Sequence, residues 1–281
     1  MSKKSRITTI ALTIALVLPM LLLSSSCKKD TIDGNIHAIS TLNPGDTYAI
    51  IKLKGFDGEL TFLLFEEIAP VGVNEFARAA NNRYYDNKTI HRVLPNGLIQ
   101  GGALNPNGSE AAIPEEEMFA VETHPNARNF FGALGFAVDP ETGMNYRQFH
   151  VITANKPVDI DEEAAKIKDI IDQADDDGFT PHEKREYDNL QKELTRFPDA
   201  VKERYSEQGG LHLLDGHVTV FGQLISGWDL LEELASVELV AGNRIDDDNP
   251  NLGNGNGQNS RPLDDIFIET IRIIRNDDEE E

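Results

Sequence analysis

The feature that most restricts the fold of this chain is a series of short apolar runs separated by turn-rich sequence. The runs are rich in isoleucine, leucine, valine, phenylalanine and tyrosine, which favour β-strands. They cover residues 48–53, 60–65, 89–94, 133–138, 148–153, 218–224 and 266–274. The turn at residues 55–58 predicts that the first two runs form a β-hairpin. Many short strands with few helices predict an all-β, closed antiparallel barrel.

Two helices are expected to cap this barrel. Val73, Phe76, Ala77 and Ala80 recur at the spacing of one helix face, which predicts a helix that ends near Asn82. A second helix is expected near residues 227–235.

Residues 157–210 do not fit the strand pattern. This region is strongly charged, and its apolar residues form two helical stripes. The first stripe is Ile160, Ala164, Ile167 and Ile171, and the second is Tyr187, Leu190, Leu194, Phe197 and Val201. Residues 180–183 have the form of a capping box with proline at the first helical position, and the glycine pair at 209–210 is a stop signal. We predict an inserted helical hairpin, or three short helices, between adjacent strands.

The N-terminus has the pattern of an export signal. Lys3, Lys4 and Arg6 precede an uncharged stretch at residues 7–26, whose apolar part barely reaches the length of a transmembrane helix. Cys27, the single cysteine, follows Leu-Ser-Ser-Ser and resembles the lipidation site of a bacterial lipoprotein. An ordinary secretory peptide is the alternative. We expect a signal at 1–26, a tether at 27–45, a folded domain at 46–276 and an acidic tail at 277–281.

The formal net charge of −22 argues against nucleic acid as a partner, because such a surface repels phosphate. The acidic runs do not match an EF-hand loop, and the histidines show no zinc-ligand spacing. Residues 246–257 are interpreted as a long turn, with an irregular cation site as the alternative. We therefore expect no metal and no cofactor.

The most informative stretch is residues 89–102, Thr-Ile-His-Arg-Val-Leu-Pro-Asn-Gly-Leu-Ile-Gln-Gly-Gly. Segments 132–137, 148–151 and 214–222 follow it in order. Together the four segments resemble the signature of the cyclophilins. The resemblance covers about residues 48–156 and 211–274 and leaves the signal, the tether and the insertion outside it. It implies a closed eight-stranded barrel capped by two helices, and peptidyl-prolyl cis/trans isomerase activity on Xaa-Pro bonds.

The resemblance also implies roles for individual residues. Arg92 would be the catalytic residue, donating a hydrogen bond near the prolyl nitrogen as the amide loses conjugation. Gln100 would bind the substrate backbone or hold Arg92, while Leu98 and Leu214 would wall the proline pocket. His91 would support its strand rather than touch substrate.

The remaining implied site residues are Ala137 and Gln148, which would line a groove for the residues before proline, and His150, which would form the pocket floor. His150 stands where cyclophilins usually have phenylalanine, and an imidazole is smaller and costs more to desolvate. Three further pocket positions also depart from the family pattern, namely Gly97, Leu213 and Val218. These changes predict a shallower pocket and weaker turnover of small peptides. A histidine that fills the core behind an inoperative pocket is the alternative.

We predict a monomeric prolyl isomerase that assists the folding of exported or envelope proteins and is held by Cys27 at the outer membrane or the periplasmic side. The alternative is a catalytically weak proline-peptide-binding or scaffold module that uses the helical insertion for partners. His150 and Gly97 favour the alternative, whereas Arg92 and the two glutamines favour the enzyme.

Overall fold

The computed structural model describes residues 35–38, 42–108, 117–139, 141–173, 181–240 and 260–276. The predicted signal at 1–26, the lipidation site Cys27, the turn at 246–257 and the acidic tail at 277–281 lie outside these residues.

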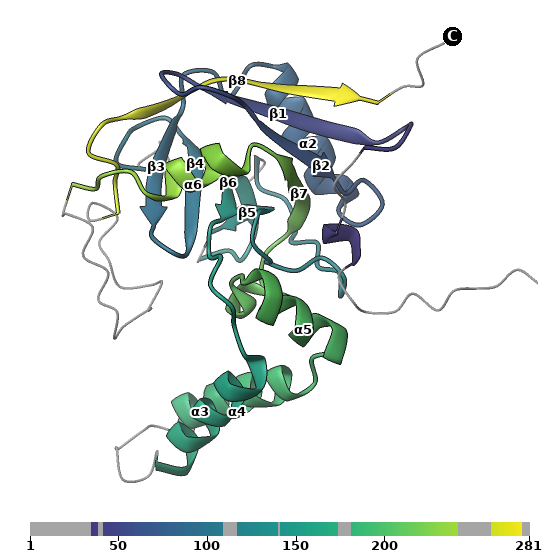
Figure 1. The fold of residues 1–281 in the computed structure, drawn as a ribbon, viewed down its shortest axis with the longest axis vertical. Helices are drawn as coiled ribbons and strands as arrows, with labels where there is room; N and C mark the ends of the chain where they lie inside the picture. Colours follow the sequence, from purple (N-terminus) through teal and green to yellow (C-terminus); the bar gives the residue numbers. More distant parts are fainter. Residues whose placement is uncertain are drawn as a thin grey trace, which may run out of the picture. The chain divides into compact units, whose positions relative to one another are not determined.

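Eight antiparallel strands close into a barrel, as predicted (Figure 1). Their order around the barrel is β1-β2-β7-β5-β6-β4-β3-β8. The strands are β1 (Thr47–Leu53), β2 (Leu60–Leu64), β3 (Thr89–Leu94), β4 (Leu98–Ala103), β5 (Ala133–Val138), β6 (Asn145–Ile152), β7 (Val220–Ser226) and β8 (Ile266–Arg275). The apolar pattern did not mark β4, because Gly101 and Gly102 interrupt it. A β-carbon at Gly101 would lie 2.5 Å from Cδ1 of Ile90, so a side chain there would require the Ile90 side chain to shift.

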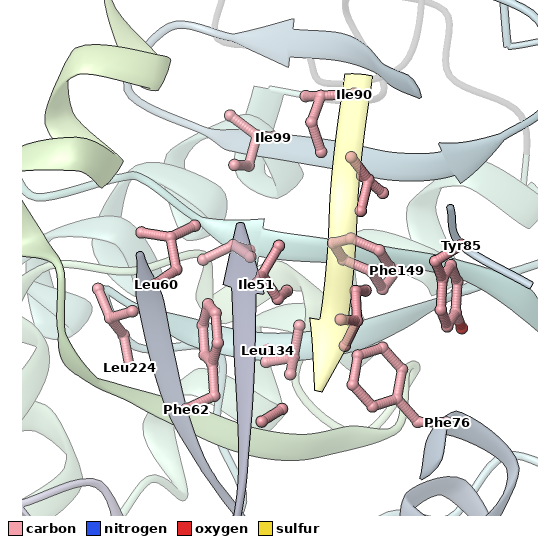
Figure 2. Packing of buried hydrophobic residues seen from close by; sticks show 14 of the residues in the cluster. Ile51, Leu60, Phe62, Phe76, Tyr85, Ile90, Ile99, Leu134, Phe149 and Leu224 are labelled. Carbon is pink, nitrogen blue, oxygen red and sulfur yellow. The ribbon is translucent and has the colours of Figure 1, made fainter. Parts of the chain in front are cut away.

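The barrel interior is filled by every second residue of the strands, as the two-residue period of a β-strand requires. Ile51, Phe62, Ile99, Leu134 and Phe149 converge there (Figure 2). Each such side chain contributes about 1.5–3 kcal/mol when fully buried. Because these residues point inward, their sequence neighbours on the same strands point to the outer face.

Both predicted capping helices are present, as α2 (Pro70–Asn81) and α6 (Trp228–Ala235), and each contributes apolar side chains to this core. Phe76 of α2 packs its ring 5.0 Å from that of Phe221. Pro70 occupies the first turn of α2, where its missing N–H costs nothing. The carboxylate of Glu122 accepts hydrogen bonds from the backbone N–H groups of Val71 and Gly72, at 3.2 and 2.7 Å. A distant side chain thus satisfies donors that the helix itself leaves open.

Three helices form the predicted insertion: α3 (Ile160–Gln173), α4 (Pro181–Thr195) and α5 (Asp199–Gln208). The two predicted stripes meet in one cluster, which contains the buried residues Ile160, Ala164, Ile167, Leu194, Val201 and Tyr205 together with Phe130 of the barrel. The helix α5 ends at Gly209, whose φ of 75° suits glycine. The glycine pair therefore stops the helix as the sequence indicated.

Residues 35–37, within the segment predicted as a tether, pack onto the barrel. A short 3₁₀ helix, η2 (Asn35–His37), places His37 in a buried position. The His37 Nδ1 atom lies 2.6 Å from Oε1 of Gln223, and the ring makes edge contacts with Phe65 and Phe130. Sequence periodicity did not reveal this anchor because it depends on one histidine.

Within the described residues, no helix is both long and apolar enough to cross a bilayer. The same part of the chain holds no group of three histidine, cysteine, aspartate or glutamate side chains that could bind a metal ion.

Candidate active site

Three of the predicted site residues lie side by side on the outer face of the barrel. The strand register places Arg92 opposite Gln100, and Gln100 opposite His150. Directly opposed residues of neighbouring strands share one face of a sheet. Their neighbours Val93 and Ile99 belong to the interior core, so the row formed by Arg92, Gln100 and His150 faces outward.

Two hydrogen bonds connect Arg92 to the next strands. Its Nη1 donates to Oε1 of Gln100 at 3.3 Å, and Nε2 of Gln100 donates to Oε1 of Gln148 at 2.9 Å. Gln148 is only 4% exposed, so its position is fixed by the surrounding protein. The chain of amides holds the guanidinium from one side. Because a guanidinium presents five N–H donors in a fixed fork, it can make several hydrogen bonds at once.

The guanidinium of Arg92 is half-buried, and this burial lowers the pKa of Arg92 below its usual value. Arginine starts from so high a pKa that it keeps its charge at neutral pH. A cation with few water neighbours acts more strongly on a nearby dipole than one in bulk water does.

His150 is buried in the same row, on the other side of Gln100 from this cation. It is 4% exposed, and burial, with a smaller effect from the charge of Arg92, lowers the pKa of His150 to about 4. The imidazole is therefore neutral near pH 7. Among the described residues, its Nε2 has no hydrogen-bond partner.

Gly135 explains how the imidazole fits. A β-carbon at Gly135, on the adjacent strand, would lie 2.6 Å from Nε2 of His150 and 3.0 Å from the backbone oxygen of Thr219. The part of the ring formed by Nε2 and Cε1 therefore lies close to the bare backbone of β5. A glycine within a strand is a signal of such close approach, and this one could have been recognised in the sequence.

An apolar cluster lies on the same outer face, next to the polar row. It contains Leu98, which is 7% exposed, together with Ile152, Val220 and the partly buried Leu214. Leu98 pairs with Ile152 across the β4–β6 ladder. Leu214 reaches the cluster from a 3₁₀ helix, η4 (His212–Leu214). Both leucines predicted to wall a proline pocket are thus brought together.

The other positions that depart from the family pattern fall at the edge of this cluster. Leu213 is 47% exposed, whereas Val218 is partly buried in the cluster. Gly97 is buried, and its backbone oxygen accepts hydrogen bonds from the N–H groups of Thr153 and Ala154 at 2.8 and 3.0 Å. Gly97 therefore ties β4 to the end of β6 rather than adding a ring to the pocket.

Ala137 and Gln148 come from the neighbouring strands β5 and β6. The register between these strands shifts between Phe136 and Val138, which places Ala137 at an irregularity of the ladder. Phe136 points into the core, so Ala137 points to the outer face, as Gln148 does. The two predicted groove residues therefore share this face, and bulges of this kind often re-aim side chains beside sites.

His91 is buried at 6% exposure, and burial lowers its pKa to about 4. Its ring packs against Gly108, where a β-carbon would lie 2.6 Å from it. This position agrees with a supporting role for His91.

The sequence analysis missed a buried carboxylate next to Leu214, that of Asp215. Asp215 has a side chain only 3% exposed, and it accepts hydrogen bonds from the backbone N–H and side-chain Nδ2 of Asn129, at 2.8 and 3.0 Å. It also pairs with Nη1 of Arg128 at 3.2 Å and accepts from the Tyr205 hydroxyl at 2.7 Å. The sequence Leu-Asp-Gly at residues 214–216 is that of an ordinary turn, so it does not indicate a buried side chain. The available signal was Tyr205, which continues the helical stripe from Val201 by four residues.

Comparison with known proteins identifies the family of this chain. The profile of the family described as cyclophilin type peptidyl-prolyl cis-trans isomerase/CLD matches residues 48–271. A putative peptidyl-prolyl cis-trans isomerase of Staphylococcus saprophyticus is 30% identical over 218 residues, which cover 77% of this chain and 87% of the relative. A protein of the same description from Staphylococcus aureus strain COL is 30% identical over 216 residues, with the same coverage.

Solved structures share the fold. A cyclophilin-type isomerase of Cryptosporidium parvum, crystallised in the presence of the dipeptide Ala-Pro, superimposes with a TM-score of 0.51 at 18% identity. The match covers 81% of this chain and 98% of that one. A second crystal structure of the same isomerase gives the same TM-score and covers 82% of this chain.

Proposed function

This chain belongs to the cyclophilin-type peptidyl-prolyl cis-trans isomerases, and from that membership we propose that Arg92 catalyses rotation about Xaa-Pro bonds in exported or envelope polypeptides. The observation that carries the proposal is the half-buried guanidinium of Arg92, held by Gln100 beside an apolar cluster that contains Leu98 and Leu214.

The reaction breaks no covalent bond. Rotation about the peptide bond is opposed by resonance worth about 18–20 kcal/mol, and uncatalysed prolyl isomerisation takes tens to hundreds of seconds. A catalyst has only to bind the twisted amide more tightly than either planar form.

Arg92 supplies the interaction that favours the twisted form. As conjugation is lost, the lone pair returns to the prolyl nitrogen, which then becomes a hydrogen-bond acceptor. An N–H of the guanidinium donates to that lone pair. Gln100 and Gln148 hold the donor in place before substrate arrives, so little reorganisation is needed during the reaction.

The apolar cluster supplies the socket for the proline ring. Leu98 and Leu214 form its walls, and contact with them removes water that would otherwise favour the more polar planar amide. His150 forms the floor as a neutral ring, so it does not repel the nearby guanidinium. Because imidazole is smaller and more polar than phenyl, turnover of small peptides is weak. Ala137 and Gln148 line the path of the residues before proline.

The test is the rate of cis/trans exchange of an Ala-Pro peptide, measured by NMR exchange spectroscopy with wild type and Arg92→Ala. We expect the substitution to lower the acceleration by about a hundredfold, the usual effect of removing one preorganised donor. Arg272→Ala is the matched control. Arg272 is also an arginine on the barrel, but it lies on β8 and forms an ion pair with Glu59. This control should keep the wild-type rate.

The scaffold alternative gives a different result in the same experiment. If wild type binds the peptide but neither wild type nor Arg92→Ala accelerates exchange, the chain is a proline-peptide-binding module and the catalytic role of Arg92 is refuted.

We further propose that the mature chain is anchored to the cell envelope through lipid on Cys27, with proline-containing polypeptides as its partners. The support is the charged start, the uncharged stretch and the cysteine that follows it. Cys27→Ser should move the protein from the membrane fraction to the soluble fraction and abolish labelling by a radioactive fatty acid. Retention of the label in the variant would refute the anchor.

A further inference from the structure

The last helix of the insertion is fixed to the barrel at several points. Tyr205 of α5 is fully buried, and its ring centre lies 4.5 Å from that of Phe130. Its backbone oxygen accepts a hydrogen bond from the N–H of Val158, where the insertion begins. Gly210 forms a β-bridge with Phe130, just after α5 ends. The C-terminal part of the insertion is therefore continuous with the barrel.

The hydroxyl of Tyr205 reaches one particular residue of the barrel domain. It donates to Oδ2 of Asp215 at 2.7 Å. Burial is the main cause that raises the pKa of Tyr205 well above 10, so the phenol keeps its proton and stays a donor. Asn129 and Arg128 supply the other donors to this carboxylate. A buried carboxylate with this many donors has a fixed position.

Asp215 directly follows Leu214, the proposed wall of the proline pocket. The segment between the insertion and this wall is held at both ends. The N–H of Leu211 donates to the backbone oxygen of Asn129 at 2.8 Å, and Asp215 accepts from Tyr205. Leu213 is 47% exposed, so it contributes little packing to η4. Hydrogen bonds at the two ends act together with the packing of Leu211 and Leu214 against the apolar cluster to set where Leu214 lies.

From this geometry we infer that Tyr205 is a positioning residue, through which the helical insertion holds the Leu214 wall of the proline pocket in place. The inference rests on the proposed function in one respect, the assignment of Leu214 to that wall. It gives the insertion a part in substrate binding without any contact between its helices and the substrate.

The test compares Tyr205→Phe with Val201→Ala in the full chain. Tyr205→Phe keeps the buried ring and removes only the hydroxyl. Val201→Ala weakens the packing of the same helix, since Val201 is fully buried in the insertion cluster, but Val201 has no hydrogen bond to Asp215. For Tyr205→Phe we expect KM for an Ala-Pro peptide to rise about fivefold, as for the loss of one ordinary hydrogen bond, with kcat unchanged. Val201→Ala should leave KM unchanged.

Hydrogen exchange provides a readout that does not depend on turnover. The amides of Leu214 and Asp215 donate to the backbone oxygens of Leu211 and His212, so their exchange reports directly on η4. Their exchange should accelerate in Tyr205→Phe and not in Val201→Ala. The inference is overturned if exchange at these amides is unchanged in Tyr205→Phe, or if Val201→Ala accelerates it equally. If exchange changes as expected but Arg92→Ala keeps full activity, the positioning stands and the proposed catalytic role fails.

Discussion

Lowering the pH from 7 to 5 should strongly destabilise the folded protein. His37, His91 and His150 are each 4–6% exposed, and burial is the largest cause that lowers each pKa to about 4. An unfolded histidine has a pKa of about 6.5, so between pH 6.5 and 4 the unfolded chain binds more protons. The contribution of the neutral imidazoles to the unfolding free energy is therefore fully present above pH 6.5, the unfolded pKa, and is lost as the pH falls from 6.5 towards 4.

The magnitude follows from the two pKa values. For one histidine, the difference between the folded and unfolded titrations amounts to about 2 kcal/mol between pH 7 and 5. Three such residues give about 5 kcal/mol, a large part of the usual 5–15 kcal/mol of a folded domain. Burial also lowers the pKa of His212, which acts in the same direction. The raised pKa of Asp215 acts in the opposite direction, because this carboxyl gains its proton more readily when folded.

Urea unfolding at pH 7, 6 and 5, followed by the fluorescence of Trp228, the single tryptophan, measures this loss. His150→Phe should remove about one third of the pH dependence, because one of the three titrating imidazoles is gone. One buried histidine alone should lower the unfolding free energy by more than about 1.5 kcal/mol between pH 7 and 5. A smaller decrease would refute the claim that burial keeps these imidazoles neutral.

Three further changes test the site and its supports. His150→Phe should raise turnover of an Ala-Pro peptide several-fold, because phenyl is less costly to desolvate against the proline ring. An unchanged rate in stopped-flow kinetics would mean that the ring plays no part in the pocket. Gly135→Ala should lower the unfolding free energy by about 1–3 kcal/mol, since the new methyl group would lie 2.6 Å from His150 and 3.0 Å from the Thr219 backbone. An unfolding free energy equal to wild type would contradict that close approach. Glu122→Ala should cost about 1 kcal/mol by removing the acceptor at the start of α2, including the 2.7 Å bond from Gly72, and a loss below about 0.3 kcal/mol would mean that water replaces the carboxylate.

Much of the barrel could be predicted from the sequence because its strands carry their own local signals. Apolar runs and turns placed seven strands, and the family resemblance implied an eighth without locating it in the chain. The apolar runs and turns need no knowledge of distant contacts. Arg92 and Gln100, by contrast, were assigned through the family resemblance, and the structure places them on consecutive strands joined by a short turn.

The rest depended on contacts between distant parts of the chain. Asn129 and Asp215 are 86 residues apart, and nothing near either residue indicates their hydrogen bond. The burial of His37 similarly depends on Gln223, which is 186 residues away. His150 was recognised as an unusual pocket residue, but its fit against Gly135 required the register of β5 and β6.

The place where the insertion leaves and rejoins the barrel has an evolutionary consequence. Gly209 lies close to Lys156, since a β-carbon at Gly209 would be 2.6 Å from the backbone oxygen of Lys156. The chain therefore enters and leaves the insertion at neighbouring points of the barrel. The flanking strands β6 and β7 each pair with β5 independently of the helices. Related sequences could therefore change the length or the surface residues of α3 and α4 without altering any strand pairing of the barrel. Only α5, which is hydrogen-bonded to the barrel through Tyr205, would be expected to tolerate few such changes.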